Sequence, residues 1–296
     1  MRYRGGMEQL LITGVPEHFN YPWKKLIVEQ PFLKKYDVQL IWEDEPKGSG
    51  AMNRSLREGN TDLAIVLTES FIADRIAGNP ARALGFYVES PLTWGVHTNP
   101  QFAAKSIADL KESQFLISRF GSGSHLMAFL LAEREGFGSS TLQFEVIGDL
   151  QGALRSAKSN TPKLFLWEKF TTSPYVQQGK FARIGEIPTP WPCFVCVARP
   201  EVVHTHRALL VELQALLWQE IEEMHQDRAL HKKIAAMYQL DPEETLSWLS
   251  NTTWATNAYM GASSFTTTME FLLRAGIITH SESVEHFVYP EFVRIV

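Results

Sequence analysis

The segment QFLISRFGSGSHLMAFLL, residues 114–131, contains the main clue to how this chain folds. Its apolar start predicts a buried strand at 114–118, and the apolar residues after the small, polar loop predict a helix at 124–135. A strand that passes through a short loop directly into a helix is half of a parallel strand–helix–strand unit. The segment therefore predicts an α/β fold.

Strand-like and helix-like segments alternate on both sides of this unit. We expect further strands at residues 10–13, 38–42, 62–67, 83–88, 144–147, 163–167 and 194–198. We expect helices at residues 24–32, 51–58, 106–111, 150–156, 202–237, 242–248 and 265–275. Strands that are apolar throughout are typical of parallel sheets that are covered by helices on both faces.

The length of the chain predicts two domains. It has 296 residues, of which 45% are hydrophobic, and at this size a single core tends to divide. We expect lobe 1 to comprise 7–90 and 196–296, and lobe 2 to comprise 95–188. Two strands would form a hinge, with crossings near 88–96 and 187–197. A ligand cleft would then lie between the lobes, outside the carboxyl ends of the strands, and close by hinge motion.

Charge and hydropathy exclude several classes of protein. The net charge is −5 and the pI is about 6.0, whereas nucleic-acid binders are usually basic. No stretch approaches the roughly 20 apolar residues of a membrane span, so we expect no membrane insertion. Residues 1–9 are polar and resemble no export signal, which predicts a cytoplasmic protein. A periplasmic or extracytoplasmic location is the alternative if a signal precedes this sequence, and a monomer and a dimer are both compatible with it.

The loop at 118–125 is the strongest candidate for ligand binding. A helix N-terminus offers free backbone N–H groups and a positive dipole end, which suit an anion. Glycines let the backbone approach a ligand closely, and an arginine can give a bidentate fork to a carboxylate, sulfonate or phosphate. The alternative is an ordinary helix start capped by Ser124. The candidate residues are Ser118, Arg119, Gly121, Ser122, Gly123, Ser124 and His125.

Other strand ends supply candidates for the remaining walls of the cleft. Ligand pockets are mostly apolar with a few convergent polar groups, so we select both polar and aromatic residues. Each aromatic residue could equally be part of the core. These further candidates are Thr13, His18, Phe19, Thr68, Glu69, Ser90, Trp94, Asp149, Trp167, Glu168 and Trp191.

The sequence indicates neither a metal site nor a cofactor. Its only cysteines, Cys193 and Cys196, lie in an apolar, strand-like run, where residues three apart point to opposite faces. Two buried strand cysteines are therefore a better interpretation than a redox or zinc site. No catalytic motif is present, and we assign no catalytic residue. If the protein is an enzyme, His18, His125 and Glu168 are the acid–base candidates.

Four phrases carry a resemblance to a known family. They are GNTDLAI at 59–65, SPLTWG at 90–95, SRFGSGSH at 118–125 and LLRAGII at 272–278. The chain resembles type 2 periplasmic binding proteins, in the branch of thiamine-pyrimidine-precursor-synthase-like and alkanesulfonate/nitrate/taurine-binding-like proteins. This resemblance implies two α/β lobes, a two-strand hinge and a ligand over the 118–125 loop.

Two classes of function follow from the pattern and the resemblance. The first is a solute-binding protein that closes on a small anionic or heteroaromatic molecule, either with a membrane transporter as partner or as a sensor. The second is a cytosolic biosynthetic enzyme on the same fold, similar to thiamine-precursor or menaquinone-pathway proteins. Recovery of an unchanged ligand would favour the first class.

Overall fold

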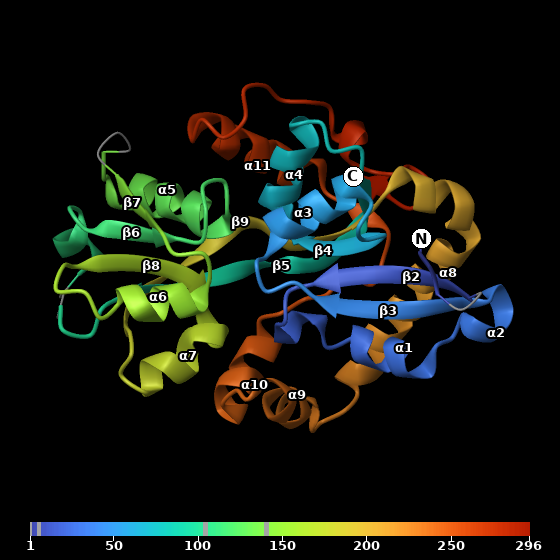
Figure 1. The fold of residues 1–296 in the computed structure, drawn as a ribbon, viewed down its shortest axis with the longest axis horizontal. Coiled ribbons are helices and arrows are strands. Elements are labelled where there is room, and N and C mark those ends of the chain that lie inside the picture. Colours follow the sequence, from blue (N-terminus) through green and yellow to red (C-terminus); the bar gives the residue numbers. More distant parts are fainter. Residues whose placement is uncertain (1, 5–6, 103–105, 139–141) are drawn as a thin grey trace.

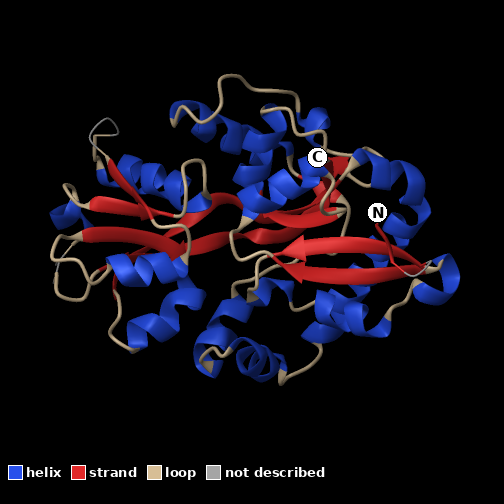
Figure 2. Cartoon of the chain, viewed as in Figure 1, coloured by secondary structure: helices blue, strands red, loops and turns tan. Residues whose placement is uncertain are grey.

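The computed structural model describes residues 2–4, 7–102, 106–138 and 142–296. The molecule consists of two α/β lobes placed side by side, as the sequence predicted (Figure 1). Nine strands form one continuous sheet that runs through both lobes, and helices cover its two faces (Figure 2).

Lobe 1 is built around a short parallel sheet. Its strands β2 (Met7–Gly14), β3 (Val38–Asp44) and β4 (Leu63–Leu67) are parallel, with β2 in the middle. Strand β1 (Arg2–Arg4) pairs antiparallel with β2 at the edge. The helical elements that follow these strands are η1 (His18–Asn20), α1 (Trp23–Glu29), α2 (Leu33–Tyr36), α3 (Ser49–Glu58) and α4 (Thr68–Ile76).

Lobe 2 repeats the same scheme. Strands β6 (Gln114–Ile117), β7 (Gln143–Val146) and β8 (Lys163–Glu168) are parallel, with β6 in the middle. The helical elements of this lobe are η2 (Ile107–Leu110), α5 (Gly123–Glu135), α6 (Leu150–Ser156) and α7 (Lys169–Gln177).

Two long strands connect the lobes. Strands β5 (Arg82–Thr98) and β9 (Ala182–Ala198) pair antiparallel along their length; β4 pairs with one end of β9, and β8 pairs with the far end of β5. Their register shifts at several places, including on both sides of Pro91, which lies opposite Pro192 and has no N–H to donate to the ladder. This irregular middle is the two-strand hinge. The sequence suggested separate segments here, whereas each is one strand of 17 residues.

The C-terminal third is helical and covers lobe 1. It contains α8 (Pro200–His225), α9 (Leu230–Tyr238), α10 (Pro242–Ser250), α11 (Ala262–Arg274) and η4 (Val284–Phe287), and the short parallel pair β10 (Tyr259–Met260) and β11 (Arg294–Ile295). The helical region predicted at 202–237 is two helices: α8 ends at His225, and in the turn that follows Asp227 accepts the backbone N–H of Ala229 before α9 begins. Among the described residues, no helix has the length and apolar character of a membrane span.

A buried ion pair fastens the parts of lobe 1 together. Asp62, at the start of β4, accepts the Arg199 guanidinium at 2.6 Å and the backbone N–H of Leu11 in β2 at 2.9 Å. Arg199 lies between β9 and α8, so the contact joins the start of the chain to its C-terminal third. Because one carboxylate serves both partners, Asp62 organises three segments that are distant in the sequence.

Candidate functional site

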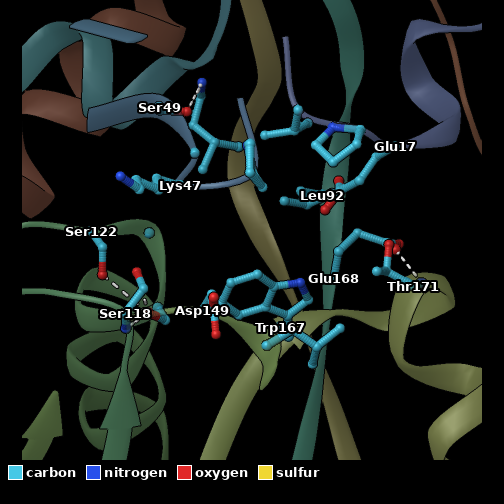
Figure 3. A pocket seen from close by; sticks show the side chains of 18 of the residues that line it. Glu17, Lys47, Ser49, Leu92, Ser118, Ser122, Asp149, Trp167, Glu168 and Thr171 are labelled. Atoms are coloured by element: carbon cyan, nitrogen blue, oxygen red, sulfur yellow. Dashed lines mark hydrogen bonds between the residues drawn. The ribbon is translucent and has the colours of Figure 1, made fainter. Parts of the chain in front are cut away.

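A cavity of about 260 Å³ lies between the two lobes (Figure 3). Residues from both lobes line it, and most of them follow the carboxyl ends of strands. Residues 15–17 follow β2, 46–49 follow β3, and 118–124 follow β6, while Asp149 and its neighbours follow β7. The two parallel sheets thus direct their carboxyl ends at a common space, where open α/β sheets bind ligands.

The wall from lobe 1 consists of two loops and the end of β4. Val15, Pro16 and Glu17 form one loop, and residues 46–49 form the other. The Ser49 hydroxyl accepts the backbone N–H of Leu67, which ties the second loop to β4 (Figure 3).

The 118–124 loop forms part of the wall from lobe 2, and its hydroxyls are used internally. Ser122, not Ser124, caps α5, because its hydroxyl accepts the backbone N–H of His125. The Ser124 hydroxyl instead accepts the N–H of Ser118 at 2.9 Å. Among the described residues, nothing accepts the backbone N–H groups of Gly123 and Ser124 at the start of the helix. These two donors are suited to an anionic or accepting group in the cavity.

The two lobes approach each other closely along this wall. The Arg119 guanidinium donates to the carbonyl of Lys47 at 2.9 Å and lies directly over Gly50. A Cβ atom at Gly123 would lie 2.9 Å from both Leu67 and Trp94, so only glycine fits between them. The cleft between the lobes is therefore narrow at this point.

The opposite end of the cavity carries two carboxyl groups. Glu17 reaches in from lobe 1 and Glu168 from lobe 2, on the side away from Ser118 and Ser122 (Figure 3). Glu168 is buried, and its two oxygens accept the backbone N–H groups of Phe170 and Thr171 at the start of α7. Burial, and then repulsion by Glu168, raises the pKa of Glu17 to about 8.

The remaining lining is mostly apolar. Trp94 and Trp167 are the large aromatic surfaces, and Leu92 and Phe194 come from the hinge strands. The buried indole Nε1 of Trp94 has no hydrogen-bond partner among the described residues. Indole faces and a few polar groups form a typical small-molecule pocket.

About half of the residues selected from the sequence line this cavity. They are Trp94, Ser118, Arg119, Ser122, Gly123, Ser124, Asp149, Trp167 and Glu168. Their contact with a ligand stays a prediction.

Several selected residues lie in the core instead. The 3-10 turn η1 turns His18 and Phe19 inward against Trp248, so their neighbour Glu17 faces the cavity. Burial lowers the pKa of His18 to about 3, and it lines only a second, adjacent cavity. His125 packs among aromatic rings and accepts the backbone N–H of Gly121. Of the three acid–base candidates, only Glu168 lines the main cavity.

The other displaced residues belong to the framework around the hinge. No loop follows β4, because the strand turns directly into α4. Thr68 and Glu69 are therefore the first residues of α4, and both are buried. Glu69 accepts the indole N–H of Trp191, which lies in the core. Ser90 accepts the backbone N–H of Thr253. Thr13 is buried inside the sheet beside β4.

The cysteines belong to the hinge strand and not to the cavity wall. Cys193 and Cys196 are free thiols in β9, with Cys193 buried and Cys196 half-buried. Burial raises the pKa of both thiols. Among the described residues, no group of three or more His, Cys, Asp or Glu side chains could hold a metal ion.

The sequence pointed to the loop that carries Pro16, which lines the cavity, but it missed other parts of the wall: Val15, Glu17, the loop at 46–49, Leu150, Gln151 and Thr171. Their position just after predicted strands was the available signal, because loops at the carboxyl ends of parallel strands gather at one edge. Side-chain chemistry alone does not single out a proline or a surface lysine.

Comparison with known proteins agrees with this geometry. A family model described as Ca3427-like PBP matches residues 94–187. The structure of the CA3427 gene product of Candida albicans has a TM-score of 0.84 at 24% identity, with 96% of each chain covered. It is described as having the generic periplasmic binding protein fold. This chain has the periplasmic binding protein fold.

Other proteins with this fold also align over the whole chain. The alkanesulfonate-binding protein SsuA from Xanthomonas axonopodis pv. citri, bound to MOPS, has a TM-score of 0.77 at 14% identity, covering 97% of this chain and 98% of its own. A ligand-binding component of an ABC-type import system from Staphylococcus aureus has a TM-score of 0.71 at 12% identity, with 97% and 98% covered. No curated protein matches this chain.

Proposed function

We propose that this chain binds a small organic molecule in the cavity between its lobes, in a transport-associated or sensory role. The observation that carries the proposal is the convergence of strand-end loops from both lobes on one cavity. A ligand that touches both walls favours the closed arrangement of the lobes, because it makes contacts there that an open cleft cannot provide.

The cavity also favours particular ligand features. The free N–H groups of Gly123 and Ser124 suit an anionic or accepting group, and Trp94 and Trp167 suit a flat or heteroaromatic body. The alkanesulfonate-binding neighbour supports a sulfonate or similar acid as that group, and the import-system neighbour supports a membrane transporter as partner.

Mass spectrometry of small molecules released from the purified protein tests the proposal. We expect an intact compound that raises the melting temperature when it is added back, because a ligand at 100 times its Kd stabilises by about 2.7 kcal/mol. Absence of any such compound, together with no thermal shift across an organic-acid and heteroaromatic library, would overturn it. A compound that is consumed on incubation would instead favour the enzyme alternative.

A further inference from the structure

The two ends of the cavity carry different charged and polar groups. Among the described residues that line it, the cationic side chains are Lys47 and Arg119, and they lie with the free N–H groups of α5. The Asp149 carboxylate is on this side too, where it accepts the backbone N–H of Gly152 in α6 (Figure 3). Glu17 and Glu168 lie together at the other end (Figure 3). A ligand that matches both ends must itself carry unlike groups at its two ends.

Glu168 is held in a position that favours its charged form. Two backbone N–H groups at the start of the nine-residue helix α7 donate to its carboxylate, at 3.1 Å and 2.6 Å. The helix dipole places further positive potential there. Burial acts in the opposite direction and raises the pKa of Glu168 above its usual range. The carboxylate therefore needs a nearby cation to be fully stable.

Glu17 has no comparable support. In the part of the chain that the structure describes, no group donates a hydrogen bond to its carboxyl, which lines the cavity in a half-buried position. Burial and the nearby Glu168 charge keep it protonated at neutral pH, since its pKa is raised to about 8. Two carboxyls in one pocket cannot both ionise easily without a cation between them.

The neighbouring cations hydrogen-bond to other groups, and the Arg183 charge offsets only part of the effect of burial on the pKa of Glu168. Arg183 donates to the Lys169 carbonyl and the Ser173 hydroxyl, while the Lys169 ammonium pairs with Glu186 at 2.8 Å. The charged and titratable groups around the pair are His18, Lys169, Arg183, Cys193 and Tyr238, with Lys47, Arg119 and Asp149 elsewhere in the cavity wall.

Unpartnered polar atoms next to the pair also indicate a ligand. His18, 1% exposed, has no partner for its Nε2 among the described residues, and it lines a second cavity of about 400 Å³. Glu17 and Thr171 line both cavities. Trp94, 5% exposed, lies opposite Glu168 in the β5–β8 ladder with its indole N–H free. Buried polar groups usually have hydrogen-bond partners, so a bound molecule would supply the partners that these atoms lack.

We propose that Glu17 and Glu168 form a subsite for a protonated nitrogen of the ligand. The ligand class is a small molecule with a basic amine or amidine at one end and an anionic or accepting group at the other. This inference rests on the proposed function and specifies its ligand. When the cation binds, Glu17 releases its proton to the solvent, so two carboxylates then face one or two positive N–H donors.

Matched compounds that differ in the basic nitrogen test this subsite. The pairs are taurine with ethanesulfonate, 4-(aminomethyl)benzoate with 4-methylbenzoate, and benzamidine with benzamide. Calorimetry at pH 7 should show that in at least one pair the basic member binds about tenfold more tightly, an effect on the order of a charge-assisted hydrogen bond. Repeating the titration in buffers of different ionisation enthalpy measures how many protons binding releases. We expect about one proton for each ligand bound.

Two variants localise the effect. Glu17→Gln keeps the size of the side chain and should abolish both the preference for the basic compound of the pair and the proton release. Glu58→Gln removes an equal charge from an exposed position on α3 and should change neither.

Three outcomes would overturn the subsite: no basic compound binds better than its match, Glu17→Gln retains the preference, or binding releases no proton. These outcomes are separable from failure of the proposed function. A compound without a basic nitrogen, recovered intact from the purified protein, would refute the subsite while solute binding stands. If no compound is recovered and none in the library shifts the melt, both proposals fail.

Discussion

The stability of the hinge should depend on pH through Glu69. This side chain is fully buried at the start of α4; one oxygen accepts the Trp191 indole N–H at 2.8 Å, and the other has no partner among the described residues. Burial raises its pKa from 4.5 to about 7. Between these values the folded state binds more protons than the unfolded state, so the free energy of unfolding falls as pH rises.

The size of this effect follows from the two pKa values. One pKa unit corresponds to about 1.4 kcal/mol, and integration from pH 5 to pH 8 gives a loss of roughly 2–3 kcal/mol from Glu69. The stabilisation is fully present below pH 4.5 and is lost as pH rises through 7. Glu69 is inaccessible to solvent, so water does not screen the effect.

Urea unfolding of wild type and Glu69→Gln at pH 5 and pH 8 measures the difference. The variant keeps an acceptor for Trp191 but cannot ionise, so its stability relative to wild type should rise by roughly 2–3 kcal/mol between the two pH values. Trp191→Phe removes the hydrogen bond that lowers the Glu69 pKa, so the loss should extend to higher pH. A relative change below about 0.5 kcal/mol, or one of opposite sign, would refute the reasoning, because an effect that small is typical of an ordinary surface substitution.

Three further changes test the cavity and the framework. Arg119→Ala removes the donor to the Lys47 carbonyl. Calorimetry should show that the recovered ligand binds about tenfold more weakly, or worse. An unchanged Kd would exclude a role of Arg119 in closure or binding. Gly123→Val adds a branched side chain where even a Cβ atom would lie 2.9 Å from Leu67 and Trp94. The thermal shift caused by the ligand should vanish, while the ligand-free protein should still melt cooperatively. Among the described residues, Asp62→Ala leaves the Arg199 guanidinium with only Glu201, at 3.7 Å, and the backbone N–H of Leu11 without its acceptor. It should cost about 3–5 kcal/mol in urea unfolding, and a cost under 1 kcal/mol would contradict the role of this ion pair.

The fold could be predicted from the sequence because its determinants are local. Apolar runs such as Leu63–Leu67 can only be buried strands of a helix-covered sheet, and their alternation with helical segments specifies parallel units. The 118–124 loop was found for the same reason, since a strand, a glycine-containing turn and a capped helix follow each other within one unit.

Half of the candidate site could not be predicted, because whether a side chain faces the cavity depends on the tertiary structure. Glu17 and His18 are neighbours, yet the turn η1 directs His18 into the core and leaves Glu17 in the cavity wall. Trp94 and Trp191 both lie on the hinge strands, but the shifted register turns Trp94 to the cavity and Trp191 to Glu69. Side-chain direction depends on twist and register, which the composition of a segment does not reveal.

The sequence by itself determined the α/β class and the strand–loop–helix unit around 118–124, since each arises from contacts between residues near in the chain; chain length and the family resemblance indicated two lobes. Only the tertiary structure decided which groups meet across the cleft. Glu17 and Glu168 are far apart in the sequence and come from different lobes. Their meeting depends on how β5 and β9 carry one lobe against the other, and long-range strand pairing of this kind leaves no local signal.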